Sequence, residues 1–469
     1  MRIFLTVPLS DERFNAIPDI GLGYLATCCR EAGHEVYILD CLLEKSTMAD
    51  FIRCLKRYKP DVLGIKTYSC DIKRTDEMCQ EARQILVELI TILGGPHPSS
   101  EIPERIFHQI PNAQYAFAGE AEAGLPEFLA RFVNGTTDFE NIPGLIWRDD
   151  TGAVRANSKV YTTNLDTLSF PAWDLIDPRK YNWGYSYMTT KLPAAPMVMT
   201  RGCPFRCTFC GSHLITGRHV RKRSVDNIIN EMKMLRRDYG VQTIDIVDEN
   251  FAFDREFLIE FCQRMISEKP GLLWNCPYGV RLTNLDEEVI VLMEKAGCFG
   301  VSVGVESGSD RILKLIRKGL TRETVVQKVQ LIKRLTNMMV QGYFIIGFPG
   351  ETRNDIHDTI ELARSLPFDL VTFCPLRVTP GTEIFTTLLA NSVISLELDY
   401  AGLGQHYFVR SYCDIPEQEM QKLYRRAYFR FYFRLKVVLN LMKRMSSPAH
   451  VKIILNGLWR LIGSHHKKD

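Results

Sequence analysis

The segment TRGCPFRCTFC at residues 200–210 places three cysteines within eight residues. Cys203, Cys207 and Cys210 have the spacing C-x3-C-x2-C and follow a predicted strand at residues 197–200. Three thiolates on one tight loop can hold three irons of a [4Fe–4S] cluster and leave the fourth iron open. An open metal position is typical of catalytic rather than structural sites.

A zinc site is the alternative for this loop. His213 follows the third cysteine and would complete a Cys3His set, which the spacing alone does not exclude. Most of the 14 cysteines, such as Cys262 and Cys298, stand singly in apolar surroundings. That setting is typical of reduced core residues in a chain without a secretion signal.

The cysteine loop opens a series of six predicted βα units over residues 193–390. The strands are expected at residues 197–200, 243–247, 273–278, 300–305, 339–346 and 370–375, with helical segments between them. This pattern predicts a partial (β/α)6 barrel of the TIM type. Its chemistry is expected in the loops at the carboxyl ends of the strands.

A second α/β domain is predicted upstream, over residues 1–135. Its strands are expected at residues 3–7, 35–40, 61–67, 89–93 and 114–118, and its helices at residues 21–32, 47–58, 71–86, 101–110 and 121–134. Five strands that alternate with five helices predict a flavodoxin-like, doubly wound parallel sheet. Ligands of such sheets bind beyond the carboxyl ends of the strands.

Two further regions complete the predicted organisation. Residues 136–192 are expected to form a connector with a β-hairpin at residues 144–148 and 153–158. Residues 391–469 are expected to form a basic helical region, with a last helix at residues 451–462. A helical cap with a solvated basic face and a peripheral membrane contact are the two interpretations of that region.

The charge distribution excludes a general nucleic-acid binder. Residues 417–469 carry 12 Lys or Arg against 3 Asp or Glu, whereas the whole chain has a net charge of only +3. The remaining 416 residues are therefore acidic, with a net charge of −6.

No apolar run approaches the roughly 18 residues that span a bilayer. We therefore expect a cytoplasmic protein.

The barrel half of the chain resembles the radical S-adenosylmethionine (radical SAM) superfamily. The signature of that family is C-x3-C-x-aromatic-C, and Phe209 occupies the aromatic position. Three later strand ends also resemble family motifs: DENF at residues 248–251, GVESG at residues 304–308 and GYFIIGFPGE at residues 342–351. The resemblance implies that the cluster binds SAM at its open iron and cleaves it to a 5′-deoxyadenosyl radical.

The same resemblance implies a set of residues that contact SAM. Glu249 would accept a hydrogen bond from the SAM amine, and Glu306 would accept from the ribose hydroxyls. The implied SAM contacts are Phe209, Asp248, Glu249, Asn250, Arg281, Glu306, Ser307 and Gly347. The sequence singles out no residue that acts on the substrate itself.

The upstream half resembles the cobalamin-binding domain of cobalamin-dependent radical SAM enzymes, through residues 18–40, 94–103 and 118–122. The motif D-x-H-x-x-G, which supplies an axial histidine in other cobalamin domains, is absent. The resemblance therefore implies cobalamin held without histidine ligation, or a domain retained only for architecture. The implied cobalamin contacts are Thr67, Ser69, Gly94, Gly95, His97, Gly119 and Glu120.

The resemblance implies a cobalamin-dependent methyltransferase that acts on an unactivated carbon of a small-molecule or natural-product substrate. It also implies an electron donor of the flavodoxin or ferredoxin type. A cyclase or rearrangement enzyme with a tetrapyrrole- or lipid-like substrate is the alternative within the same architecture. A protein that binds zinc or an iron–sulfur cluster without turnover is the alternative from another class.

Overall fold

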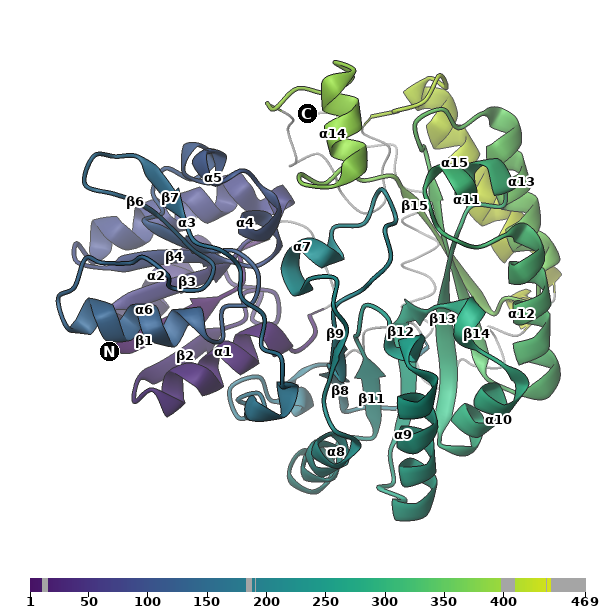
Figure 1. Cartoon of the computed structure of the whole chain (residues 1–469), viewed down its shortest axis with the longest axis horizontal. Coiled ribbons are helices and arrows are strands. Elements are labelled where there is room, and N and C mark those ends of the chain that lie inside the picture. The colour runs from purple at the N-terminus through teal and green to yellow at the C-terminus, as the bar shows by residue number, and fades with distance from the viewer. Residues whose placement is uncertain (11–15, 183–187, 190, 398–409, 436, 440–469) are drawn as a thin grey trace. The chain divides into compact units, whose positions relative to one another are not determined.

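The computed structural model describes residues 1–10, 16–182, 188–189, 191–397, 410–435 and 437–439 (Figure 1). The chain divides into two compact units. The first comprises Met1–Gly279, Leu292–Phe299 and Arg377–Gly404, and the second comprises Val280–Val291, Gly300–Leu376 and Gln405–Asp469.

The first unit contains a seven-stranded sheet in the order β2-β1-β3-β4-β5-β6-β7. Its parallel strands are β1 (Arg2–Thr6), β2 (Glu35–Leu39), β3 (Val62–Lys66), β4 (Ile90–Gly94) and β5 (Tyr115–Phe117). The order β2-β1-β3-β4-β5 is that of flavodoxin-like sheets. The predicted flavodoxin-like topology is therefore confirmed.

The predicted hairpin joins this sheet. Its strands, β6 (Leu145–Arg148) and β7 (Val154–Ala156), pair antiparallel, and β6 pairs antiparallel with β5. Residues 145–147 are all buried, which explains the pairing, because three consecutive apolar side chains need cover on both faces. The hairpin is therefore part of the sheet's core, although the sequence suggested that it lies in a connector.

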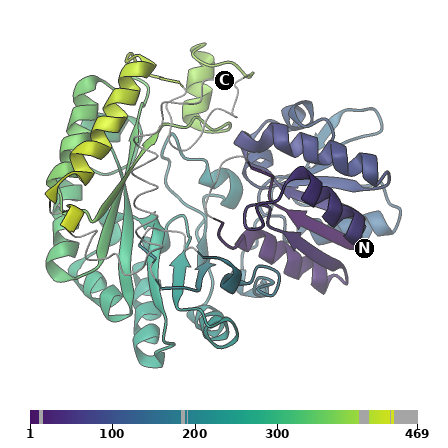
Figure 2. The ribbon, with the colours of Figure 1, turned by 180° about the vertical axis from the view of Figure 1, so that it is seen from behind.

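Helices cover both faces of the sheet (Figures 1 and 2). α1 (Ile20–Glu31) and α6 (Gly124–Val133) neighbour each other, as do α2 (Met48–Tyr58), α3 (Ile72–Ile85) and α5 (Pro103–Gln109). The sequence did not predict the five-residue helix α4 (Pro96–Ser100). Gly95 precedes it with φ +89°, a left-handed conformation that favours glycine, and Pro96 occupies the first helical turn.

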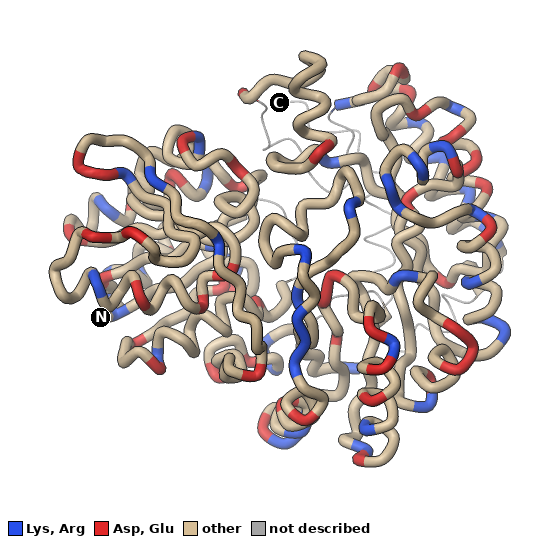
Figure 3. The backbone as a smooth tube through the Cα atoms, in the orientation of Figure 1, with Lys and Arg blue, Asp and Glu red and all other residues tan. Residues whose placement is uncertain are grey.

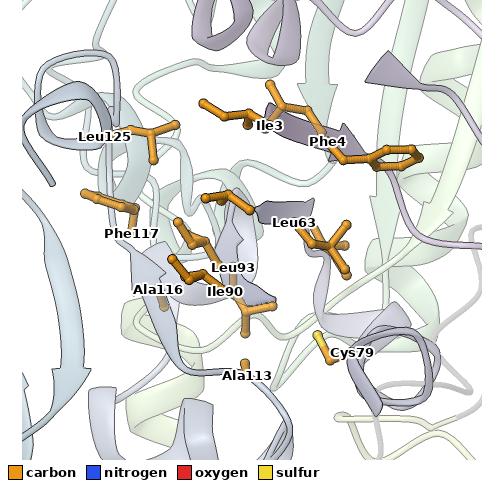
Figure 4. Close-up of a cluster of buried hydrophobic side chains, with 14 of the residues drawn as sticks. Ile3, Phe4, Leu63, Cys79, Ile90, Leu93, Ala113, Ala116, Phe117 and Leu125 are labelled. Atoms are coloured by element: carbon orange, nitrogen blue, oxygen red, sulfur yellow. The ribbon is translucent and has the colours of Figure 1, made fainter. Parts of the chain in front are cut away.

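The core of this sheet is a layer of apolar side chains from the parallel strands. Ile3, Phe4, Leu63, Ile90 and Leu93 come from three different strands, β1, β3 and β4, and are all buried. Figure 4 shows side chains of this cluster, which includes Cys79 of α3. The strands are apolar along most of their length because helices bury both faces.

Two further sets of parallel strands match the predicted βα series. In the first unit, β11 (Thr243–Ile246) pairs with β8 (Ala194–Met197) and with β12 (Leu273–Val280). β13 (Cys298–Glu306), β14 (Met339–Ile346) and β15 (Leu370–Pro375) also run parallel. Among the described strands, β8 pairs only with β11, and β15 only with β14, so the strands do not close into a barrel.

These strands alternate with helices, as predicted. The helices are α8 (Val225–Tyr239), α9 (Arg255–Glu268), α10 (Glu287–Lys295), α11 (Asp310–Leu315), α12 (Arg322–Leu335), α13 (Arg353–Ser365) and α14 (Glu383–Ala390). Several begin at side-chain caps: Ser224, Asp254, Thr321 and Thr352 each accept a hydrogen bond from a backbone N–H of the first turn.

The first strand of this series ends earlier than the sequence predicted. β8 ends at Met197, and residues 200–201 form β9, which pairs antiparallel with β10 (Arg221–Lys222). The side chain of Asp248 explains the break, because it accepts hydrogen bonds from the backbone N–H groups of Met199 and Thr200. The cysteine loop therefore lies between two short antiparallel strands.

The basic C-terminal region begins with α15 (Glu417–Tyr432). Tyr428 and Tyr432 point their hydroxyl groups at β15, where they bond to the backbone of Phe373 and Val371. Tyr428 and Tyr432 therefore have a structural role: they hold α15 against β15 within the second unit. The predicted helix at residues 451–462 lies outside the described residues. No helix in the described part of the chain is long and apolar enough to cross a membrane.

Replacement of Leu93 by Ala should lower the free energy of unfolding by about 2–5 kcal/mol, because Leu93 is fully buried and the change leaves a cavity. Val87→Ala is the matched control, since Val87 is 85% exposed just before the same strand. Its effect should stay within about 0.5 kcal/mol. Urea unfolding followed by circular dichroism measures both. Equal midpoints for the two variants would contradict the assigned core.

Candidate functional site: the cysteine loop and two sheet edges

The cysteine loop is held by backbone hydrogen bonds at both ends. Cys203 N–H donates to the carbonyl of Gly217 at 3.2 Å, and Cys210 N–H donates to the carbonyl of Cys207 at 3.2 Å. Gly202 has φ +98°, and a Cβ atom there would lie 2.1 Å from the carbonyl oxygen of His219. Only glycine fits this close approach.

The three thiols are half-buried, and burial together with the nearby Cys210 and Cys207 raises the pKa of the Cys203 thiol. Among the described residues, no three His, Cys, Asp or Glu side chains gather closely enough to hold a single metal ion. The zinc alternative needs four ligands that converge on one ion. A [4Fe–4S] cluster instead takes one thiolate on each of three irons, which three cysteines on one loop can supply.

The segment 248–250 follows β11 and has the sequence Asp-Glu-Asn. The two carboxylate oxygens of Asp248 accept three hydrogen bonds at 2.8 Å, from the N–H of Met199 and from the N–H and Oγ1 of Thr200. Burial raises the pKa of Asp248 to about 7 in spite of these bonds. Asp248 therefore fixes the chain that leads into the cysteine loop.

Glu249 lies beside the end of the cysteine loop. Its Oε1 accepts a hydrogen bond from Thr216 Oγ1 at 2.8 Å, and burial raises the pKa of its carboxyl. Asn250 is buried, and its Nδ2 has no hydrogen-bond partner among the described residues. A buried amide without a partner is costly, so this edge is suited to receive a polar ligand.

The other predicted SAM residues are described within the second unit, apart from Phe209, which is half-buried in the cysteine loop. Glu306 has φ +68° and pairs with Lys318 Nζ at 2.6 Å. Arg281 donates to the carbonyl of Lys318 at 2.7 Å. The structure therefore brings Arg281 and Glu306 together around Lys318, which the sequence did not single out.

Ser307 and Gly347 lie in internal hydrogen-bond networks. Ser307 Oγ lies 3.2 Å from Thr359 Oγ1. Gly347 N–H donates to Glu351 Oε2 at 2.6 Å, and the N–H of Phe348 donates to the same oxygen. Burial raises the pKa of Glu351 to about 8. Glu351 therefore closes the turn that carries Gly347, a role that its place in the GFPGE motif could have suggested.

The predicted cobalamin residues gather at the carboxyl edge of the first sheet. Thr67 N–H donates to the carbonyl of Gly94 at 2.8 Å, and His97 N–H donates to the carbonyl of Thr67 at 3.0 Å. Ser69 Oγ lies 3.2 Å from His97 Nδ1. Gly119, after β5, donates its N–H to Ser99 Oγ at 2.9 Å. The structure thus brings the ends of β3, β4 and β5 together.

The two glycines after β4 differ in the space around them. A Cβ atom on Gly94 would meet no atom within 4 Å, whereas one on Gly95 would lie 2.9 Å from Lys66 Cγ. His97 is fully buried, and burial lowers its pKa to about 4. The side of Gly94 is therefore open, and the buried imidazole of His97 is neutral at pH 7.

Glu120, which is also a predicted cobalamin contact, forms ion pairs with arginines of β9 and β10. It pairs with Arg221 at 2.7 Å and with Arg201 at 3.5 Å, and Arg201 also pairs with Glu122 at 2.8 Å. All four side chains are at least nine-tenths buried. These pairs connect the loop after β5 to β9 and β10, and no local sequence pattern predicted them.

Comparisons with known proteins match both halves of the chain. The sequence model of the radical SAM superfamily matches residues 197–363, and that of the B12 binding domain matches residues 8–129. An uncharacterized methyltransferase of Pyrococcus horikoshii is 29% identical over 444 residues, 94% of each chain. The cytidylyl-2-hydroxyethylphosphonate methyltransferase of Streptomyces wedmorensis is 27% identical and covers 81% of this chain and 79% of its own.

One further relative and one solved structure complete the comparison. The anaerobic magnesium-protoporphyrin IX monomethyl ester cyclase of Rubrivivax gelatinosus is 25% identical, over 79% of this chain and 66% of its own. The cobalamin-dependent S-adenosylmethionine radical enzyme OxsB, solved with aqua-cobalamin and SAM bound, superposes with a TM-score of 0.75. It is 16% identical over 97% of this chain and 70% of its own, so it shows the shared fold.

The cysteine loop, the DEN segment and the glycine-bearing edge of the first sheet lie within the two matched regions. The chain therefore combines a radical SAM domain with a B12-binding domain.

Proposed function

We propose that this protein is a cobalamin-dependent radical SAM methyltransferase that methylates an unactivated carbon of a small molecule. The observation that carries the proposal is the presence of two cofactor sites in one chain. A loop with three cysteines at the spacing C-x3-C-x2-C fits a [4Fe–4S] cluster, and a flavodoxin-like domain with an open glycine at its edge fits cobalamin.

When bound, the cluster would supply the electron that cleaves SAM, and cobalamin would carry the methyl group. The protein residues would bind and orient these groups. Cys203, Cys207 and Cys210 would hold three irons, and Glu249 would accept a hydrogen bond from the SAM amine. Asp248 keeps the loop in place through its bonds to residues 199 and 200. A loop held in this way would keep the cluster and SAM in a fixed relative orientation.

The edge of the first sheet supports cobalamin bound without a histidine ligand. Gly94 leaves open space, so backbone can approach the corrin ring closely. His97 lies nearby but is fully buried and hydrogen-bonded to Ser69. The remaining proposed contacts of this edge are Thr67, Gly95 and Gly119. Glu120 belongs to the ion pairs with Arg221 and Arg201.

A cyclase is the second candidate, because the sequence similarity to a magnesium-protoporphyrin IX monomethyl ester cyclase extends over 79% of this chain. The two candidates differ in their use of SAM. A methyltransferase consumes a second SAM and releases S-adenosylhomocysteine, whereas a cyclase needs no methyl transfer.

Two partners belong to the proposal. A flavodoxin or ferredoxin would reduce the cluster. The end of α15 would contact a membrane surface, since Phe429, Phe433 and Leu435 are exposed in a basic region. This contact suits a lipid-like substrate.

The reconstituted protein, reduced under anaerobic conditions, should form both 5′-deoxyadenosine and S-adenosylhomocysteine from SAM. Liquid chromatography with mass detection measures both products. Formation of 5′-deoxyadenosine without S-adenosylhomocysteine, in the presence of bound cobalamin, would favour the cyclase. The absence of both products from protein with a full cluster would reject the proposal.

Replacement of Cys203, Cys207 or Cys210 by Ala should abolish 5′-deoxyadenosine formation, because each change removes a thiolate ligand from one iron. Cys262→Ala and Cys298→Ala are the controls, since both thiols are buried in the core. They should keep the iron content and the visible spectrum of the cluster. A Cys207→Ala protein that still cleaves SAM would show that the ligand assignment is wrong.

Gly94→Trp should prevent cobalamin binding and leave the cluster intact, because the indole would fill the open space above the end of β4. The variant should lose S-adenosylhomocysteine formation and keep its 5′-deoxyadenosine formation. Val87→Trp is the control, since Val87 is 85% exposed and precedes β4, at the opposite end of the same strand. Equal cobalamin binding by wild type and Gly94→Trp, measured by absorbance after gel filtration, would place the corrin ring elsewhere.

A further inference from the structure

A buried chain of hydrogen bonds joins the loop after β5 to the carboxylate of Glu249, all within the first unit. Arg221 of β10 lies at its centre and is followed in the sequence by Lys222 and Arg223. Figure 3 draws all Lys and Arg residues in blue. Its two terminal nitrogens donate to the two oxygens of Glu120 at 2.8 and 2.7 Å. This bidentate geometry fixes the plane of the guanidinium group.

The other side of the guanidinium holds the end of a helix. Nη2 of Arg221 donates to the carbonyl oxygen of Thr216 at 2.6 Å. Thr216 is the last residue of α7 (Ser212–Thr216), the short helix that follows the cysteine loop. Carbonyls at a helix C-terminus have no partner inside the helix, so the guanidinium supplies one.

Thr216 also contacts Glu249, so the fixed position of Thr216 orients the Glu249 carboxylate. Its Oγ1 donates to Glu249 Oε1 at 2.8 Å, while its own carbonyl is held by Arg221. The next residue, Gly217, accepts the N–H of Cys203 at 3.2 Å. Arg221 thus fixes the backbone of the residue that orients Glu249 and borders the cysteine loop.

Stability alone does not account for this arrangement. A buried ion pair is often no more stabilising than apolar residues of the same volume, because desolvation of two charges offsets their attraction. The pair does, however, define a direction, because a planar fork with five N–H donors tolerates little displacement of its acceptors. The ion pair therefore serves to hold the acceptors of the guanidinium group in fixed positions.

We propose that Arg221, oriented by Glu120, is a positioning residue that sets Glu249 for the SAM amine through Thr216. This inference rests on the proposed function, since it takes Glu249 as the acceptor for that amine. It also gives Glu120 a different role from the cobalamin contact that the sequence suggested.

Two variants test the inference on the intact protein with its cluster loaded. Thr216→Val removes the hydroxyl and keeps the carbonyl, and Arg221→Lys keeps the charge and loses the fork. Both should raise the KM for SAM in 5′-deoxyadenosine formation by about tenfold, the effect of one lost hydrogen bond to a charged group. The kcat should change less, and the change that SAM causes in the paramagnetic resonance of the reduced cluster should weaken. Thr216→Ser should restore wild-type values.

Arg223→Lys is the matched control. Arg223 pairs with Glu231 at 2.6 Å, and the two side chains are 3% and 0% exposed, as buried as Arg221 and Glu120. None of the hydrogen bonds that the structure gives Arg223 reaches Thr216. Arg223→Lys should therefore lower the melting temperature and leave the KM for SAM unchanged.

Two results would overturn the inference. One is a wild-type KM for SAM in Thr216→Val, which decides the matter even if Arg221→Lys fails to fold. The other is an equal rise in KM for Arg221→Lys and Arg223→Lys. A wild-type protein that carries a full cluster but neither binds nor cleaves SAM would instead reject the proposed function, and the inference with it.

Discussion

Parallel strand pairing is the constraint on which the chemistry of this protein depends. Parallel strands need crossover helices, and they bring all their carboxyl ends to one edge of a sheet. In the first unit, β3, β4 and β5 therefore deliver Thr67, Gly94 and Gly119 to a single edge. β8 and β11 do the same for the cysteine loop and the DEN segment. Strand pairing thus brings residues that are far apart in the sequence to the same edge.

Buried polar side chains then convert these edges into shaped sites. Asp248 accepts three hydrogen bonds from residues 199 and 200, and Arg221 holds the far end of the cysteine loop through Thr216. Each group is costly to bury and is tolerated because its partners satisfy it. The segments on both sides of the three cysteines are therefore fixed by the protein itself.

The sequence predicted most of the elements, because the parallel strands are apolar runs and many helices begin at capping residues. It also predicted the cysteine loop, since thiolate spacing is local. It missed the pairing of β6 with β5, because long-range strand partners leave no local signal. It could not separate Asp248, whose oxygens are occupied, from Glu249, since neighbouring carboxylates look alike. The sequence also did not single out Lys318 and Arg221, because their roles depend on partners that lie 12 and 101 residues away in the chain.

The binding of SAM to an open iron of the cluster is the central claim, and electron–nuclear double resonance measures it directly. The reduced [4Fe–4S] protein is mixed with SAM that carries 15N in its amino group. Hyperfine coupling between the cluster spin and this 15N is expected, because the amine would lie in the first coordination sphere of the fourth iron. A spectrum without 15N coupling, from protein that retains its cluster and contains bound SAM, would contradict the assignment of this site.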